Sequence, residues 1–440
     1  MPLMRERNHV PDQLPAVLAI AIFIGAYVLI ATERIPRTAV ALGGAALMLA
    51  LGISNAEEAF FDEATGVDWN VVFLLLGMMV IVSVMRVTGV FEFLAIWAAK
   101  RAGGRPFRLM VLLVLITAVA SALLDNVTTV LLIAPVTVLI CQRLGLAVVP
   151  YLIAEVFASN IGGTSTLVGD PPNIIIASRG DLSFNAFLIN LAPIVIVLLA
   201  VLVLLCRWLF ASAFVSHPEK VVELMSLSER DAIRDRTLLV KSLGVLTIVL
   251  VGFVLHPVLG YEPSVVALLG AGLLVTISRI TTDDALQDVE WGTLAFFMGL
   301  FVMVGGLVAT GVLGGLSERA ASLAGADLFG FSTLLLWGSA VLSGIVDNIP
   351  YTASMAPVVA DVVGSDPDRE VLWWALALGA DLGGNATAIG ASANVLVLGI
   401  AARNGYPIGF WQFTRYGLLV TFATIAVAWA YVWLRYFALA

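Results

Sequence analysis

Long uninterrupted runs of apolar residues constrain this chain more than any other feature of its sequence. Such runs occur at 15–31, 38–53, 71–85 and 184–205, and a helix needs about 20 apolar residues to cross a bilayer. Only 12% of the residues are charged, about half the share in a soluble domain. We therefore expect an all-α, multi-pass protein of the plasma or inner membrane.

The two halves of the chain match each other at a nearly constant offset. Chance similarity between apolar sequences matches Leu with Val, but it does not align Asp-Asn, Ala-Pro and Gly-Gly in order. The pairs 222 positions apart include Trp69 with Trp291, Asp125-Asn126 with Asp347-Asn348 and Ala134-Pro135 with Ala356-Pro357. After one deletion the offset is 221, and it pairs Gly162-Gly163 with Gly383-Gly384, Thr166 with Thr387 and Asn173 with Asn394. This predicts a first repeat at 1–211, a linker at 212–237 and a second repeat at 238–440.

The distribution of Lys and Arg indicates how the halves sit in the membrane, because cytoplasmic loops collect basic residues. Basic residues cluster at 100–108, in the linker and in the loop 32–37, which carries Arg34 and Arg37. The acidic segment 54–68 has no Lys or Arg and is expected outside. Placing the basic loops inside requires an odd number of crossings in each half, so the two repeats, with five expected spans each, are expected to be inverted.

Each half also contains two interrupted segments. The segments 107–143 and 331–363 are too short for two crossings, so we expect re-entrant hairpins that turn at Asp125 and Asp347. The segments 148–178 and 371–403 are broken in the middle by Gly residues, and the first also by Pro171-Pro172. Unwound backbone at membrane depth is tolerated only where it is buried or lines a polar cavity.

Chain breaks at matching places of two inverted halves are typical of secondary transporters, with the substrate at the repeat interface. Half-helix N-termini offer free N–H groups, unwound carbonyls offer partial negative charge, and Thr, Ser and Asn add neutral donors and acceptors. Carboxylates must carry any protons, for which we expect Asp125, Asp347, Asp381 and Glu155. The expected substrate-binding or ion-binding residues are Asp125, Asn126, Asn160, Gly163, Thr164, Ser165, Thr166, Asp170, Asn173, Asp347, Asn348, Asp381, Gly384, Asn385, Thr387 and Asn394.

Some of these residues also have a purely structural interpretation. Asp125 and Asp347 can cap the returning hairpin helices, although an Asp near the membrane centre costs at least about 2.5 kcal/mol on insertion scales. Asp170 stands directly before two prolines, as a helix N-cap does. Glu155 is either a proton acceptor on the cytoplasmic access path or a solvated interfacial residue.

Several function classes are disfavoured. The three histidines, His9, His217 and His256, occupy terminal or loop positions, which leaves no imidazole relay inside the membrane. The Gly-rich stretch 162–169 lacks a following Gly-Lys-Ser/Thr, so the chain has no Walker A motif and any ATPase must be a separate subunit. No metal site, cofactor or catalytic constellation is predicted. A net charge of −8 without a basic run argues against nucleic acid. A channel is the alternative class.

The motifs at these breaks resemble those of the ion transporter superfamily. They are 124–129 (LDNVTT), 158–163 (ASNIGG), 169–173 (GDPPN), 346–350 (VDNIP), 382–385 (LGGN) and 390–394 (GASAN). More narrowly, they are similar to the branch that contains the arsenical pump membrane proteins and the melanosomal P protein. The resemblance implies a homodimer in which a scaffold domain holds the interface. A mobile domain with both hairpins and both broken helices then moves in an elevator-like shift.

The resemblance also implies a substrate class. Relatives export arsenite or antimonite against protons, exchange sodium for protons, or carry carboxylates and other anions. We therefore expect proton-coupled efflux of arsenite, antimonite or a related small anion. The alternatives are sodium/proton antiport and sodium-coupled anion or carboxylate transport. The hairpin tips read Asp-Asn here, where dicarboxylate and citrate carriers have Ser-Asn-Thr, and a core without Lys or Arg favours a neutral or cationic solute.

Overall fold

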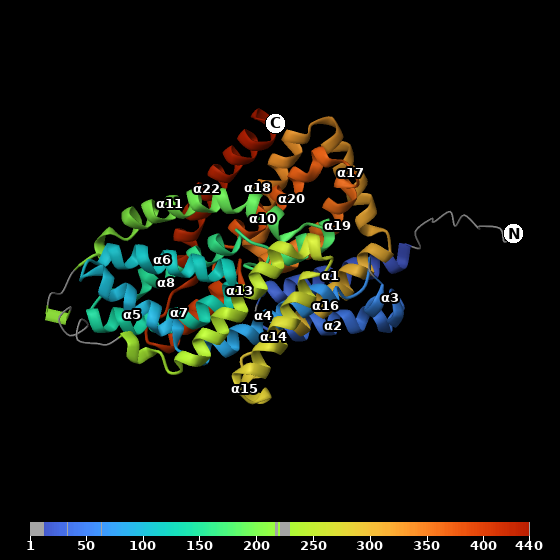
Figure 1. Cartoon of the computed structure of the whole chain (residues 1–440). Helices are drawn as coiled ribbons and strands as arrows, with labels where there is room; N and C mark the ends of the chain where they lie inside the picture. Colours follow the sequence, from blue (N-terminus) through green and yellow to red (C-terminus); the bar gives the residue numbers. More distant parts are fainter. Residues whose placement is uncertain (1–12, 33, 63, 216–218, 221–228, 440) are drawn as a thin grey trace.

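The computed structural model describes residues 13–32, 34–62, 64–215, 219–220 and 229–439, which form an all-helical bundle (Figure 1). Within these ranges, nine helices are long and apolar enough to cross a membrane. The prediction of an all-α, multi-pass membrane protein is therefore confirmed. Residues 1–12 of the predicted first repeat, which include His9, lie outside the described residues, as do residues 216–218, with His217, and 221–228 of the predicted linker.

The first half of the chain contains eleven α-helices and a short 3₁₀ helix within the described residues. They are α1 (Gln13–Thr32), α2 (Arg37–Ala50), α3 (Ala56–Phe61), α4 (Trp69–Val87), α5 (Val90–Ala102), α6 (Pro106–Leu123), α7 (Asn126–Leu144), α8 (Val148–Gly163), α9 (Pro171–Gly180), α10 (Phe184–Asn190), α11 (Ala192–Leu209) and η1 (Ala211–Ala213).

The second half begins with a 3₁₀ helix before its first long helix. Its elements are η2 (Glu229–Ala232), α13 (Arg236–Leu259), α14 (Pro263–Ser278), α15 (Thr282–Leu286), α16 (Trp291–Ala309), α17 (Val312–Ala326), α18 (Leu328–Val346), α19 (Asn348–Val363), η3 (Pro367–Glu370), α20 (Val371–Gly383), α21 (Ser392–Arg403), α22 (Phe410–Trp433) and η4 (Leu434–Ala438).

Equivalent helices of the two halves begin at the offsets found in the sequence. The starts of α4 and α16, of α5 and α17, and of α7 and α19 are 222 positions apart, and those of α9 and α21 are 221 apart. The halves also pack into each other. Helix α4 packs along α14 and α16 packs along α2 (Figure 1), while α9 packs on α19 and α21 packs on α7. Each half therefore completes the packing of the other.

The structure differs from the sequence interpretation at three places. The apolar run 184–205 is divided into α10 and α11, and Pro193 stands in the first turn of α11, where a proline ring is tolerated. Helices α5 and α17 were not expected, and each follows a glycine in a left-handed conformation, Gly89 and Gly311. His256 lies in the last turn of α13 rather than in a loop, because the apolar pattern continues past Pro257.

Both segments that were predicted to be hairpins, 107–143 and 331–363, form a helix, a turn and a second helix. In the first, α6 ends at Leu123 and Asp125 caps α7, accepting a hydrogen bond from the amide of Thr128 at 2.8 Å. In the second, Asp347 caps α19 through the amide of Ile349 at 3.0 Å. The backbone φ of Asp347 is +100°, a region that disfavours any residue with a side chain. This turn is therefore under local strain that the first turn does not have.

Candidate transport site

The unwound segments between α8 and α9 and between α20 and α21, here called break 1 (164–170) and break 2 (384–391), meet in the interior. The side-chain amide of Asn160, at the end of α8, donates to the amide oxygens of Asn385 and Asn394, at 2.9 and 3.1 Å. Asn126, at the tip of the first hairpin, donates to Asn160 at 3.2 Å. All four side chains are buried. Residues far apart in sequence thus form one buried polar network.

Asp381 occupies the position in α20 that matches Asn160 in α8. Thr164 and Asn173 are neighbours of its carboxyl group, and they match Asn385 and Asn394, the partners of Asn160. Asp381 has no exposed surface. Within the described part of the chain, neither carboxylate oxygen has a donor in hydrogen-bond geometry. The two halves therefore present an amide and a carboxyl group in equivalent places.

Polar side chains hold both breaks in shape. The amide of Asn173 donates to the carbonyl oxygens of Gly163, Thr164 and Thr166, and that of Asn394 donates to the carbonyl oxygens of Gly384 and Thr387. These bonds satisfy carbonyls that an interrupted helix leaves without partners.

Hydroxyl groups tie each break to a hairpin. Thr166 donates to the carbonyl of Ala122 and Thr387 to that of Gly344, both at 2.6 Å. The hydroxyls of Thr164 and Ser165 donate back to the carbonyls of Asn160 and Gly162. In this structure, the four hydroxyl groups therefore all donate to backbone carbonyl groups.

The centre of the site has an excess of acceptor oxygens. Asp170, the N-cap of α9, receives a hydrogen bond from Asn348 of the second hairpin at 3.3 Å. The carboxylates of Asp381, Asp347 and Asp125 all act on it electrostatically. Among the described residues, the buried side-chain oxygens near this point without a hydrogen-bond donor are Asn126 Oδ1, Asp170 Oδ2, Asn173 Oδ1 and both oxygens of Asp381.

A bound proton or cation would stabilise this arrangement. Buried carboxylates without a partner are costly, and several of them near one another repel. Carboxyl and amide oxygens are also the ligands that hard cations prefer. The network thus has the chemistry of a proton-binding or sodium-binding site.

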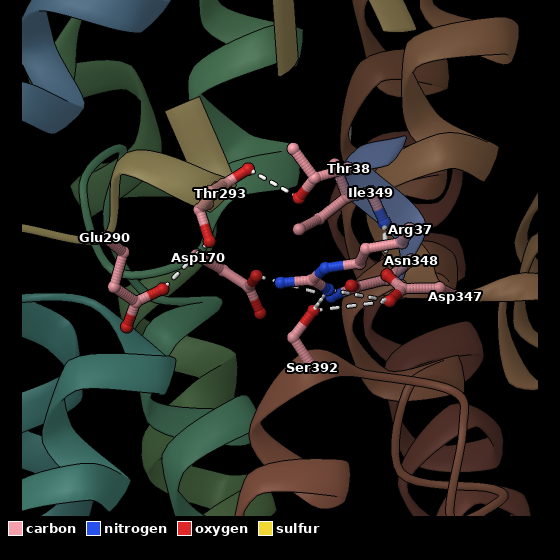
Figure 2. A network of polar contacts seen from close by, with 10 residues as sticks. Arg37, Thr38, Asp170, Glu290, Thr293, Asp347, Asn348, Ile349 and Ser392 are labelled. Carbon is pink, nitrogen blue, oxygen red and sulfur yellow. Dashed lines mark hydrogen bonds and ion pairs between the residues drawn. The ribbon is translucent and has the colours of Figure 1, made fainter. Parts of the chain in front are cut away.

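A basic residue reaches the second hairpin tip from another part of the chain. Arg37, the first residue of α2, lies 3.5 Å from the Asp347 carboxylate and donates to the hydroxyl of Ser392. Ser392 also donates to Asp347 at 3.3 Å. Figure 2 shows these side chains converging, with Asp170 joined through Asn348 and with Glu290 to one side.

The expectation of a core without Lys or Arg is therefore wrong at this edge of the site. Arg37 was assigned to a cytoplasmic loop because it follows Arg34 in a short basic segment. The start of α2 lies against the hairpin tip, and a long Arg side chain bridges the remaining distance. Sequence pattern alone gave no signal of this long-range contact.

A cavity of about 490 Å³ opens onto this group. We call it the Arg37 cavity. Its polar lining consists of Arg37, Glu290, Asp347 and Ser392. Glu290 lies just before α16, accepts a hydrogen bond from Thr293 at 2.9 Å, and burial together with the Asp125 charge raises its pKa.

A smaller cavity of about 140 Å³, the His256 cavity, occupies the matching position on the other side of the site. Its polar lining includes Asn70, Ser264, His256 and Glu262. Next to it Ser264 donates to Asn70 at 2.9 Å, and next to the Arg37 cavity Thr38 donates to the carbonyl of Gly292 at 2.9 Å. Gly292 matches Asn70 at the 222-residue offset, and Val395 of the Arg37 cavity matches Ile174 of the His256 cavity at the 221-residue offset. A further cavity of about 510 Å³ shares Asn70 and Ser178 with the His256 cavity.

Glu155 does not join the central network. It is buried in α8 and accepts a hydrogen bond from Thr137 of α7 at 2.5 Å. Its second oxygen has no donor among the residues that the structure describes. Glu155 therefore lies within the first half's own packing, between α8 and the returning hairpin helix.

With the fold and site described, the chain is recognisable as a membrane transporter. Its residues 27–379 match the family model described as "CitMHS: Citrate transporter". The chain belongs to this family, within the ion transporter superfamily, so the resemblance to that superfamily is confirmed.

Among full-length relatives, the uncharacterized transporter Mb2703 of Mycobacterium bovis is 56% identical over 427 residues, covering 96% of this chain and 99% of that one. The P protein of Sus scrofa is 33% identical over 517 residues, covering 98% of this chain and 61% of the longer P protein.

Two solved structures share the fold. The YdaH transporter of Alcanivorax borkumensis superposes with a TM-score of 0.62 at 15% identity, covering 96% of this chain and 98% of that one. MtrF of Neisseria gonorrhoeae, described as one of a class of antimetabolite efflux pumps, gives 0.63 at 12% identity, covering 98% and 96%. At these identities the likeness concerns the fold alone.

Proposed function

We propose that this protein is a proton-coupled secondary transporter that moves a small, oxygen-rich solute by alternating access. The proposed solute is arsenite, antimonite or a related anion, and efflux against an inward proton gradient is the proposed direction. With the cysteines Cys141 and Cys206 buried, arsenite is handled as a hydroxylated, hydrogen-bonding molecule rather than as a thiolate complex.

The contact between Asp381 and Asn173 carries this proposal. The amide nitrogen of Asn173 is already bonded to three carbonyl groups, and its oxygen, like both oxygens of the neighbouring Asp381, has no hydrogen-bond donor among the described residues. Two acceptors repel unless a proton or a cation lies between them. A proton on Asp381 gives this carboxyl group a hydrogen-bond donor. At the equivalent place in the first half, the side-chain amide of Asn160 is the donor.

Polar contacts between loops support an inverted arrangement of the repeats. Lys100 pairs with Glu229 at 2.6 Å, and Arg86 pairs with Asp288. Lys100 and Glu229 lie in the basic cluster and the linker, which the Lys and Arg distribution assigns to the cytoplasm. Counting the predicted spans from these segments places Arg86 and Asp288 on the same side. Arg179 donates to the carbonyl of Ala64 at 2.9 Å, and both belong to segments assigned to the outside.

Cavities on both sides of the central network support alternating access. In the inverted arrangement the Arg37 cavity opens toward the cytoplasm and the His256 cavity toward the outside. In the proposed motion, both hairpins and both broken helices move as one domain against a scaffold that forms a homodimer.

Sodium coupling is the second candidate, because unpartnered carboxyl and amide oxygens also suit a sodium ion. Purified protein in vesicles distinguishes the two. Flux of arsenite, antimonite and citrate is measured under an imposed pH gradient, and separately under a sodium gradient at equal pH. The proposal expects flux to follow the pH gradient. Flux that follows only sodium favours the second candidate, and flux insensitive to both rejects coupling.

A further inference from the structure

The carboxyl group of Glu290 lies at the wall of the Arg37 cavity, and the proposed function gives it no role. Glu290 is partly exposed and directly precedes α16. It lines the cavity together with Val127, which follows Asp125 by two positions at the tip of the first hairpin. The charge of Asp125 acts on Glu290 electrostatically. A buried acid and a partly exposed acid therefore interact at one end of this cavity.

The matching acid of the first half is held by structural bonds. Glu290 matches Asp68 at the 222-residue offset. Asp68 caps α4, accepting a hydrogen bond from the amide of Val71 at 3.2 Å, and it also accepts one from the hydroxyl of Ser178. Glu290 does not cap α16, and the residue that matches Ser178 is Gly399, which has no hydroxyl group. The carboxyl group of Glu290 thus lacks both of the bonds that hold its counterpart.

We propose that Glu290 is a proton relay between Asp125 and the cytoplasm. The Asp125 carboxylic acid gives its proton to the Glu290 carboxylate through water in the cavity, and Glu290 then releases the proton to the cytoplasmic solution. A cavity of about 490 Å³ has room for such water. The direction agrees with efflux against an inward proton gradient, because each proton that enters from outside must leave on the cytoplasmic side. This inference rests on the proposed function, which assigns the Arg37 cavity to the cytoplasm.

The charged groups around Glu290 favour brief binding of a proton. Burial and the charge of Asp125 raise the pKa of Glu290, while the guanidinium of Arg37 lowers it. Asp347 also lines the cavity, where it pairs with Arg37 at 3.5 Å (Figure 2). The hydroxyl of Thr293 donates to Glu290 at 2.9 Å and holds the carboxyl group at the cavity wall. A proton that leaves Asp125 makes that group negative and so raises the proton affinity of Glu290.

A rapid pH jump in substrate-free protein tests the relay without assuming a substrate. Purified protein in detergent is mixed into a more alkaline solution with a pH-indicator dye, and the rate of proton release is followed. Glu290→Gln is expected to slow release from the buried carboxyl groups at least about tenfold, because it removes an acid–base group from the path. Glu290→Asp keeps a carboxyl group and is expected to retain most of the rate. Added formate, a small mobile proton carrier, is expected to restore the rate of Glu290→Gln.

Flux in vesicles separates a relay from a substrate-binding role. Under an imposed pH gradient, Glu290→Gln is expected to lower the maximal arsenite flux about tenfold, while the arsenite concentration at half-maximal flux changes less than about twofold. Asp283→Asn is the matched control, because Asp283 is an exposed acid in the same segment before α16. This control is expected to match the parent protein in both experiments. Thermal unfolding of each variant identifies misfolded protein.

Three results would overturn this inference: proton release by Glu290→Gln at the rate of the parent protein, slow release that formate does not restore in folded protein, or a change in half-maximal arsenite concentration alone. Each leaves the proposed function intact if parent flux still follows the pH gradient. Conversely, parent flux that ignores the pH gradient, together with proton release that depends on Glu290, rejects the proposed function and leaves the relay standing.

Discussion

The two breaks are built to the same plan and differ at a few positions that set their polarity. Break 1 leads from Asn160 to an Asp170 N-cap and two prolines. Break 2 leads from Asp381 to Ala391 and a helix start with amide donors. Each half contributes one acid at a position where the other half has a neutral residue. The difference shows how a duplicated site becomes asymmetric, because the two acids stand at positions that are not equivalent in the two halves.

The largest expected effect comes from exchanging Asn160 and Asp381. Asp381→Asn makes the second half resemble the first and is expected to reduce proton-coupled flux by about 100-fold, within the usual range of coupling energies. The double variant Asn160→Asp/Asp381→Asn restores one acid at the equivalent place, and we expect it to recover part of the coupling. Vesicle flux under a pH gradient measures both. A double variant no better than the single variant would show that the halves are not equivalent.

Replacing the hairpin-tip acids is expected to have the next largest effect. Asp125→Asn and Asp347→Asn should each reduce flux by about tenfold or more while the protein still folds, because an acid at mid-membrane depth is costly to retain without a function. Asn is itself a good N-cap, so capping survives in both variants. Flux at the rate of the parent protein in both variants would show that these two residues only cap their helices.

The packing of the breaks gives a smaller effect on stability. A Cβ atom on Gly163 would lie 2.5 Å from the Gly169 carbonyl oxygen, whereas one on Gly384 would meet its nearest atom at 3.1 Å. We expect Gly163→Ala to cost about 1–3 kcal/mol as an overpacked site, and Gly384→Ala to cost less. Thermal unfolding in detergent compares them. Equal losses would indicate that the two breaks are equally tight.

Surface labelling tests the inverted arrangement with almost no effect on activity. Glu57 in α3 and Asp283 in α15 are exposed and lie in corresponding short helices. Cysteines at these positions are expected to react with an impermeant reagent from opposite sides of the membrane. The parent protein, whose Cys141 and Cys206 are buried, controls for background. Reaction from the same side would reject inversion.

Much of the fold was predictable from sequence because apolar length, chain breaks and the 222-residue offset are local or repeated signals. The hairpin turns at Asp125 and Asp347 and the breaks before Pro171 and Ser392 lie within or next to the predicted segments. The helices α5 and α17 were not predicted because they are short and not uniformly apolar.

The polar partners in the site were less predictable, because they depend on contacts between distant segments. The bond between Asn160 and Asn385 and the approach of Arg37 to Asp347 join residues more than 200 positions apart. Residue type identified Asp381 as a candidate, but only the structure shows that it is fully buried next to Thr164 and Asn173.

Measurement of pH inside vesicles during substrate flux tests the central claim most directly. Vesicles containing the protein and a pH indicator are given an outward gradient of arsenite or citrate, with no pH or sodium gradient imposed. The account predicts that substrate movement changes the internal pH and that Asp381→Asn abolishes this change, while Asp361→Asn does not. Substrate flux at constant internal pH in the parent protein would contradict proton coupling.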